Sequence, residues 1–184
     1  MTRDEILKAS KEMYEKDNDY KKDGLIFTYN HGNYREASYK WKPLRELTID
    51  FLLINSEEPK LYSTLHTKAI EKYNLERKNV IQETKKILKD CFNISRKVKP
   101  ENYLILSDIK LSKDEIDKFD NINTGSIIEC YYDQITKEWK IHRLREDKTL
   151  RFKTTLKEAK ILGPNAYLTA YNTIKLIKKP VNLF

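Results

Sequence analysis

Two pairs of basic residues in this sequence have a spacing that could bind an anion. Lys40 and Lys42 flank a tryptophan, and Arg143 and Arg145 flank a leucine. Side chains two positions apart on a strand project to the same side, and converging like charges repel each other unless an anion lies between them. A phosphate chain is such an anion, so both pairs are candidate phosphate-binding sites. The structural alternatives are an exposed basic strand edge for the lysines and a solvated, salt-bridged hairpin for the arginines.

Three further residues extend these pairs. Asp147 and Lys148 follow the arginines, at the expected end of the same strand. Asp23 precedes Gly24 upstream of the lysines, and its carboxylate is a candidate ligand for Mg²⁺ or Mn²⁺. The structural alternative for Asp23 is a turn, because Lys-Asp-Gly is a common entry to a strand.

The composition limits how phosphate could be bound. The four glycines are too far apart to form a GxGxxG or Walker loop, so any bound phosphate must meet Lys and Arg side chains. The 36 basic and 28 acidic residues give a net charge of +8, which favours a polyanionic partner. The two cysteines and three histidines are too scattered for a zinc site. No apolar run approaches the roughly 20 residues that span a bilayer, so we expect an intracellular protein with no membrane partner.

Helices and strands must position these residues. Strands are predicted over residues 24–29, 47–54, 102–106, 126–132 and 138–144, with a further candidate at 150–154. Helices are predicted after capping boxes that begin at Thr2 and Ser112, and over residues 63–90, 155–163 and 165–178.

Two clusters of residues carry a resemblance to a known superfamily. Residues 23–27, 40–43 and 48–51, followed well downstream by 139–148, resemble motifs IV, V and VI of the covalent nucleotidyltransferases, which comprise capping enzymes and polynucleotide ligases. Residues 48–51 and Trp139 resemble capping enzymes in particular, and the tail over 163–180 is similar to the segment that follows the OB domain in multifunctional capping enzymes of large DNA viruses.

This resemblance implies a role for each candidate residue. Asp23 would be the metal ligand, for Mg²⁺ or Mn²⁺, and GTP would be the substrate. The implied catalytic residues are Lys40, Lys42, Arg143, Arg145, Asp147 and Lys148. The implied contacts to GTP come from Lys40, Lys42, Arg143 and Lys148.

The family reaction begins at a lysine that this sequence does not supply in the expected context. That lysine, in a Lys-x-Asp-Gly motif, attacks the α-phosphate of GTP, and the resulting lysyl-GMP passes GMP to a 5′-diphosphate RNA end. Residues 21–24 match the tetrapeptide, but Ile26 stands where an arginine belongs and Lys40 follows too soon. We therefore expect a C-terminal segment that is inactive alone and needs an N-terminal nucleotidyltransferase portion, in the same polypeptide or a separate chain.

The expected fold is α+β and follows the same resemblance. Residues 1–46 would end a nucleotidyltransferase (ATP-grasp-like) sheet, and 47–154 would form an OB-fold β-barrel with a helical insertion. Residues 155–184 would form a helical tail or a linker towards a missing downstream domain. The expected location is the cytoplasm (viral factory) or the virion. Two alternatives remain at this stage: a fragment of an ATP-dependent DNA or RNA ligase, and a non-catalytic OB-fold module that binds RNA.

Overall fold

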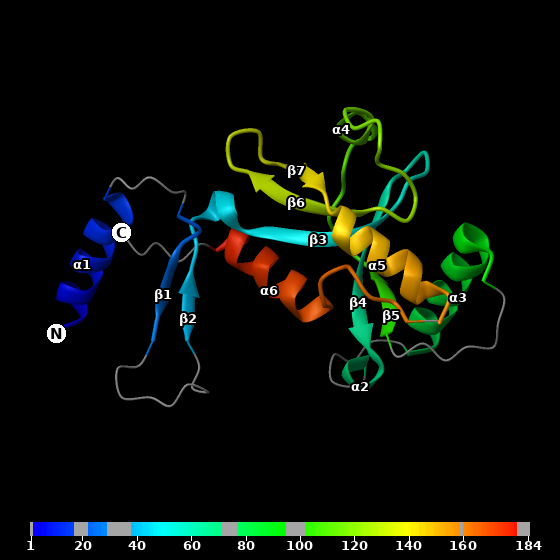
Figure 1. The fold of residues 1–184 in the computed structure, drawn as a ribbon, viewed down its shortest axis with the longest axis horizontal. Coiled ribbons are helices and arrows are strands. Elements are labelled where there is room, and N and C mark those ends of the chain that lie inside the picture. The colour runs from blue at the N-terminus through cyan, green and yellow to red at the C-terminus, as the bar shows by residue number, and fades with distance from the viewer. Residues whose placement is uncertain are drawn as a thin grey trace.

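The chain forms an α+β structure built on two antiparallel sheets (Figure 1). The computed structural model describes residues 2–16, 22–28, 38–70, 77–94, 102–158 and 160–179. A two-stranded hairpin consists of β1 (Leu25–Phe27) and β2 (Tyr39–Trp41). A five-stranded sheet has the order β5-β4-β3-β6-β7. Its strands are β3 (Thr48–Ile54), β4 (Lys60–His66), β5 (Asn102–Leu106), β6 (Ile127–Asp133) and β7 (Glu138–Leu144).

Helices accompany both sheets. They are α1 (Arg3–Glu15), the 3-10 turn η1 (Leu44–Glu46), α2 (Thr67–Ile70), α3 (Arg77–Phe92), α4 (Lys113–Asp117), α5 (Glu146–Leu156) and α6 (Tyr167–Lys178). α1 lies beside the hairpin at one end of the molecule, and the larger sheet with its helices lies at the other (Figure 1). Among the residues described, none of these helices is both long and apolar enough to cross a bilayer.

The central strand β3 is buried on both faces. Ile49, Phe51 and Leu53 belong to one apolar cluster and Leu52 to another, because successive side chains on a strand alternate between faces. This explains why residues 47–54 read as a nearly continuous apolar run. Asp50 is the exception, a carboxylate that is only 5% exposed.

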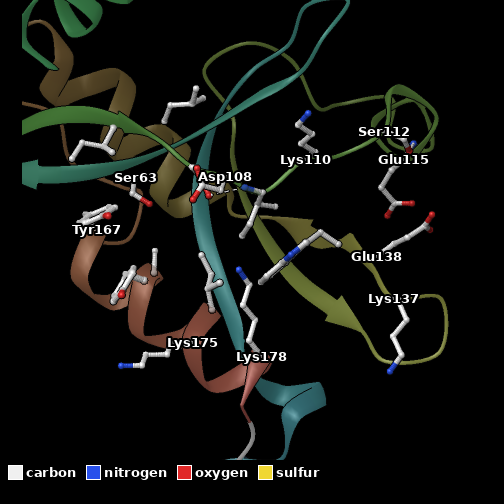
Figure 2. Close-up of a pocket in the computed structure, with 18 of the residues that line it drawn as sticks. Ser63, Asp108, Lys110, Ser112, Glu115, Lys137, Glu138, Tyr167, Lys175 and Lys178 are labelled. Carbon is white, nitrogen blue, oxygen red and sulfur yellow. Dashed lines mark hydrogen bonds between the residues drawn. The ribbon is translucent and has the colours of Figure 1, made fainter. Parts of the chain in front are cut away.

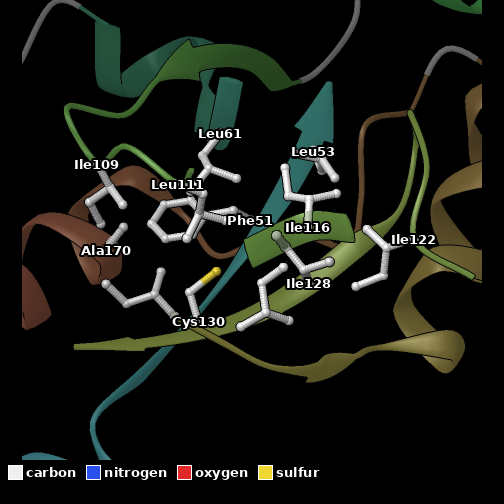
Figure 3. Packing of buried hydrophobic residues seen from close by; sticks show 12 residues of the cluster. Phe51, Leu53, Leu61, Ile109, Leu111, Ile116, Ile122, Ile128, Cys130 and Ala170 are labelled. Atoms are coloured by element: carbon white, nitrogen blue, oxygen red, sulfur yellow. The ribbon is translucent and has the colours of Figure 1, made fainter. Parts of the chain in front are cut away.

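The two largest apolar clusters of the sheet each include residues from two helices. On the first face, Ile116 of α4 and Ala170 of α6 join the cluster around Phe51 and Cys130 (Figure 3). On the second face, α3 and α5 contribute Ile87, Leu88, Phe152 and Leu156 to a cluster with Leu52 and Tyr62. Fully burying an aliphatic or aromatic side chain contributes about 1.5–3 kcal/mol, so both faces stabilise the sheet that positions the candidate site.

Residues 163–166 attach the tail to the middle of this sheet. Asn165 accepts a hydrogen bond from the backbone N–H of Asp50 through Oδ1 (2.6 Å) and donates its own backbone N–H to the Asp50 carbonyl (2.7 Å). Its carbonyl accepts from the N–H of Thr64 (3.0 Å). The tail therefore bridges β3 and β4 beyond the point where those strands pair with each other, and α6 starts from this anchor.

Several predicted elements are confirmed. The strands over 102–106 and 138–144 have the predicted bounds, and the capping box at Thr2 is present with both of its hydrogen bonds. Ser112 caps α4 as expected, and α6 begins two residues later than the predicted helix over 165–178.

The helix predicted over 63–90 is wrong at its start. β4 extends to His66, and only α2 and α3 are helical, while residues 71–76 lie outside the described residues. Residues 61–65 are all buried, so β4 lacks the apolar and polar alternation by which a half-exposed strand is recognised.

The strand candidate at 150–154 and the helix over 155–163 are also wrong. Residues 146–156 form α5, whose buried residues Thr149, Phe152 and Leu156 follow each other at spacings of three and four, as on one face of a helix. α5 ends at Leu156, and the described residues between 157 and 163 are not helical.

Candidate functional site

The first predicted cluster lies at the base of the β1–β2 hairpin. Asp23 precedes β1, and its Oδ2 accepts from the Nζ of Lys40 (2.9 Å) while its Oδ1 pairs with the Nζ of Lys42. The prediction that the two lysines project to the same side is confirmed, and the anion between them is the Asp23 carboxylate. Hydrogen bonds from Lys42 and then Lys40 lower the pKa of Asp23 below its ordinary value.

Gly24 allows this close approach. Its φ of +134° belongs to the region that favours glycine, and a Cβ at this position would lie 2.2 Å from the carbonyl oxygen of Trp41. A larger residue would separate Asp23 from the strand that carries the lysines.

As arranged here, Asp23 does not fit a resident divalent cation. Both of its carboxylate oxygens contact ammonium groups, which oppose a nearby cation. Within the described ranges, no group of three or more His, Cys, Asp or Glu side chains could surround a metal ion.

The second cluster lies across three neighbouring strands of the larger sheet. Asp50 on β3 is paired with Glu129 on β6, and Glu129 is paired with Arg143 on β7. A bulge between Glu129 and Cys130 makes His142 the extra residue on β7 and sets Arg143 opposite Glu129. Two carboxylates directly opposite each other repel, so this register requires cations.

Three cations meet that requirement. The Nε of Arg143 donates to Glu129 Oε2 (2.7 Å), and the Nη1 of Arg145 donates to both carboxylate oxygens of Asp50 (3.2 and 3.1 Å). The Nζ of Lys148 also pairs with Asp50. We call Asp50, Glu129, Arg143, Arg145 and Lys148 the paired cluster.

The contacts of the paired cluster favour the ionised form of Glu129. Burial of Glu129 raises its pKa, but the hydrogen bonds from Thr48 Oγ1 (2.7 Å) and Arg143 outweigh that effect, so the pKa of Glu129 lies below its ordinary value. For Arg145, burial lowers the pKa, while the hydrogen bond to Asp147 and the charge of Asp50 outweigh it and raise the pKa. Each buried charge is thus compensated by a partner.

The two arginines differ in environment, contrary to the expected common strand. β7 ends at Leu144, so Arg143 is on the strand, whereas Arg145 is the N-cap residue of α5. The side chain of Arg143 is 61% exposed and that of Arg145 only 21%.

Asp147 and Lys148 lie in the first turn of α5, and the expectation that they end the strand is wrong. The Nε of Arg145 donates to Asp147 Oδ1 (3.3 Å), and this hydrogen bond lowers the pKa of Asp147. Acidic groups such as Asp147 are also favoured in the first turn of a helix by its dipole.

Asp50 and Glu129 are the site residues that the sequence reasoning missed. Asp50 lies within residues 48–51, one of the segments that resemble the family. Its position inside an apolar strand could have identified it as a site residue, since a buried carboxylate needs a cationic partner. The role of Glu129 depends on the register and bulge of β6 and β7, which have no local sequence signal.

Most of the chain matches a known protein family. Residues 46–183, about three quarters of the sequence, match the family described as "mRNA capping enzyme, C-terminal domain". The whole paired cluster falls within the match, whereas Asp23, Lys40 and Lys42 precede it. No curated protein matches the sequence. Since the match covers well over half of the chain, this protein belongs to the family of mRNA capping enzyme C-terminal domains.

Proposed function

We propose that this chain is the C-terminal segment of an mRNA guanylyltransferase. The complete enzyme transfers GMP from GTP, through lysyl-GMP, to the 5′-diphosphate end of RNA. One observation carries the proposal: the family match includes Arg143, Arg145 and Lys148, and these residues, far from Asp50 in sequence, converge on it and on Glu129.

The larger sheet supports an OB-fold as the finer architecture. An OB-fold is a five-stranded, partly open Greek-key barrel. Here β3, β4 and β5 follow one another in the sheet, β6 then pairs on the other side of β3, and α4 is inserted between β5 and β6. In the proposed barrel, β5 and β7 are the strands that approach each other without pairing. In the same proposal, β1 and β2 end the nucleotidyltransferase sheet.

Arg143 is the proposed contact to the β- and γ-phosphates of GTP. Its Nε is engaged by Glu129, while its Nη1 and Nη2 make no hydrogen bond within the described part of the chain. These forked donors suit phosphate oxygens. A fixed cation strengthens its contact as charge develops on the pyrophosphate leaving group, and this lowers the barrier to lysyl-GMP formation.

Arg145, Asp147 and Lys148 are proposed to position this arginine. Arg145 joins Asp50 to Asp147, and Lys148 also pairs with Asp50, so the first turn of α5 is tied to β3. That contact fixes the end of β7, where Arg143 lies. Of the six candidate catalytic residues, three are therefore proposed to contact phosphate and three to position Arg143. The phosphate contacts are Lys40, Lys42 and Arg143, and the positioning residues are Arg145, Asp147 and Lys148.

Lys40 and Lys42 are the proposed contacts to the α-phosphate. The Asp23 carboxylate between them occupies the position of an anion, and a phosphate oxygen is the anion that would replace it. Mg²⁺ or Mn²⁺ would supply further charge neutralisation when bound. Because Asp23 as arranged does not fit a metal ion, no step of the proposed mechanism passes through one.

The viral assignment belongs to the same proposal. It rests on the resemblance of the tail over residues 163–180, and it places the enzyme in a cytoplasmic viral factory or in the virion. The nucleophilic lysine would come from an N-terminal nucleotidyltransferase portion, in the same polypeptide or a separate chain.

A label-transfer assay tests the function. The chain together with that N-terminal portion should acquire a covalent label from α-labelled GTP, and the chain alone should stay unlabelled under denaturing conditions. A label on the chain alone that disappears in Lys21→Ala would contradict the assignment; Lys21 lies outside the described residues.

The same assay separates the alternatives. Labelling from ATP in place of GTP would identify a polynucleotide ligase. If the chain combined with the N-terminal portion acquires no covalent nucleotide but still binds RNA, and that binding does not depend on nucleotide, the chain is a non-catalytic RNA-binding module.

A further inference from the structure

A cavity of about 800 Å³ lies where the two edges of the larger sheet approach α6 (Figure 2). Its walls come from the end of β5 and the segment after it, from the start of β7, and from one side of α6. Ligand-binding sites in proteins commonly have volumes of about 300–1,000 Å³. No residue of the paired cluster and none of Asp23, Lys40 and Lys42 lines this cavity, so it is a separate site.

Lysines dominate the charge of the cavity. Lys110 follows β5, Lys137 precedes β7, and Lys175, Lys178 and Lys179 belong to α6 or its end. Lys178 extends from α6 into the cavity, and Lys110 and Lys137 lie toward its far side (Figure 2). Within the described residues, none of the five has a carboxylate at ion-pair distance.

The acidic residues of the wall do not cancel this charge. Glu115 accepts the backbone N–H of Ile141 (2.9 Å) and pairs with Lys118, so it is already engaged. Asp108 and Glu138 are the other two carboxylates of the lining, against five lysines. The balance favours an anion with several charges over a single small one.

Aromatic side chains lie between the lysines. Tyr167 and Tyr171, one helical turn apart on α6, have ring centroids 6.1 Å apart and planes inclined by 31°. Ile174, Lys175 and Lys178 continue the same side of the helix. Trp139 of β7 also lines the cavity. Half of Tyr171 is exposed, so its ring is available for stacking.

We propose that this cavity, which we call the α6 groove, binds a short stretch of single-stranded RNA. Unpaired lysines meet the phosphates and aromatic rings stack with bases, which is the combination that single-strand binding uses. Asp108 and Glu138 are acceptors for ribose 2′-hydroxyl groups, which distinguish RNA from DNA. The choice of RNA as the polyanion rests on the proposed guanylyltransferase function.

Fluorescence anisotropy with this chain alone tests the proposal. The probe is a labelled single-stranded RNA of about 10 nucleotides, with DNA of the same sequence as a second probe. Lys175→Ala/Lys178→Ala should weaken RNA binding about tenfold and lower the salt slope by about 0.7 per lysine. Tyr171→Ala should weaken binding about tenfold with the salt slope unchanged, because stacking releases no counterions.

The matched control is Lys85→Ala/Lys86→Ala on α3. These lysines are also exposed on a helix, but they do not line the groove, so the variant should bind RNA as the unmodified chain does. An equal loss in both double variants, wild-type binding by both groove variants, or equal binding of DNA would overturn the proposal. Circular dichroism confirms that each variant is folded.

This assay is independent of catalysis. It uses neither GTP nor the nucleophilic lysine, so its failure leaves the guanylyltransferase proposal intact. Conversely, a restored enzyme that fails to form lysyl-GMP would leave RNA binding in the α6 groove unaffected.

Discussion

The paired cluster and the α6 groove are both rich in basic residues, but their charges are balanced differently. Arg143, Arg145 and Lys148 each contact Asp50 or Glu129 within the protein. The five lysines of the α6 groove have no such partner among the described residues. The paired cluster therefore has a defined geometry before any ligand binds. The positive charge of the α6 groove, by contrast, is not neutralised by carboxylates of the described residues.

This difference suggests a division of labour. Pre-positioned arginines suit a transition state, because a fixed donor needs no reorganisation during the reaction. Unpaired lysines on flexible side chains suit a polyanion of variable sequence, because each contact releases counterions without requiring one geometry. In our account the paired cluster serves GTP, and the α6 groove serves RNA.

The largest effect that we expect is a loss of folding stability when Asp50 of the paired cluster is replaced. Asp50→Asn removes the buried charge that Arg145 and Lys148 share, and breaking a buried ion pair by removing one partner costs about 3 kcal/mol. Urea denaturation should show this loss. Asp147→Asn is the matched control, since Asp147 contacts the same arginine but is 69% exposed, and it should lower the denaturation midpoint far less than Asp50→Asn does. Equal effects would mean that burial does not distinguish the two carboxylates.

A smaller effect is expected in the pH dependence of stability. The pKa of Glu129 is lower in the folded protein than its ordinary value of 4.5. Its contribution to the free energy of unfolding is therefore complete above about pH 4.5 and is lost as the pH falls through the lower folded pKa. Glu129→Gln should reduce the difference in stability between neutral pH and about pH 3. If the stability of Glu129→Gln depends on pH as that of the unmodified chain does, the contacts of Glu129 do not lower its pKa.

The smallest effect concerns RNA affinity outside the groove. Lys40 is exposed and already paired with Asp23, so Lys40→Gln should change the RNA affinity of the chain less than about twofold and leave the salt slope unaltered. Anisotropy with the same labelled RNA measures both quantities. A loss as large as that of Lys175→Ala/Lys178→Ala would remove the distinction between paired and unpaired lysines.

Sequence periodicity could predict much of the fold and part of the site. The bounds of β5 and β7 followed from β-forming residues, and the convergence of Lys40 and Lys42 followed from the strand repeat. β4 was missed because burial on both faces removes the alternation that marks a strand. The strand of Arg143 was expected to continue through Arg145, but Thr149 accepts the N–H of Ile127 and ties the next residues into α5.

The remaining features depend on contacts between distant residues. The charge balance around Glu129 requires the pairing of β3, β6 and β7 and the bulge that inserts His142. The helix over 165–178 was predicted, but the cavity that it lines also needs walls from the end of β5 and the start of β7. No local pattern contains that tertiary arrangement.

The most direct measurement of the central claim is a single-turnover comparison of the two half-reactions in the restored enzyme with Arg143→Ala. If Arg143 contacts the β- and γ-phosphates, lysyl-GMP formation should slow by about 10²–10³. Transfer of GMP from preformed lysyl-GMP to diphosphate RNA should change little, because pyrophosphate has already left. Arg143→Lys should not restore the first step, since an ammonium group lacks the forked donors. Normal formation of lysyl-GMP with a defect confined to the RNA step would contradict the account and make Arg143 an RNA-binding residue.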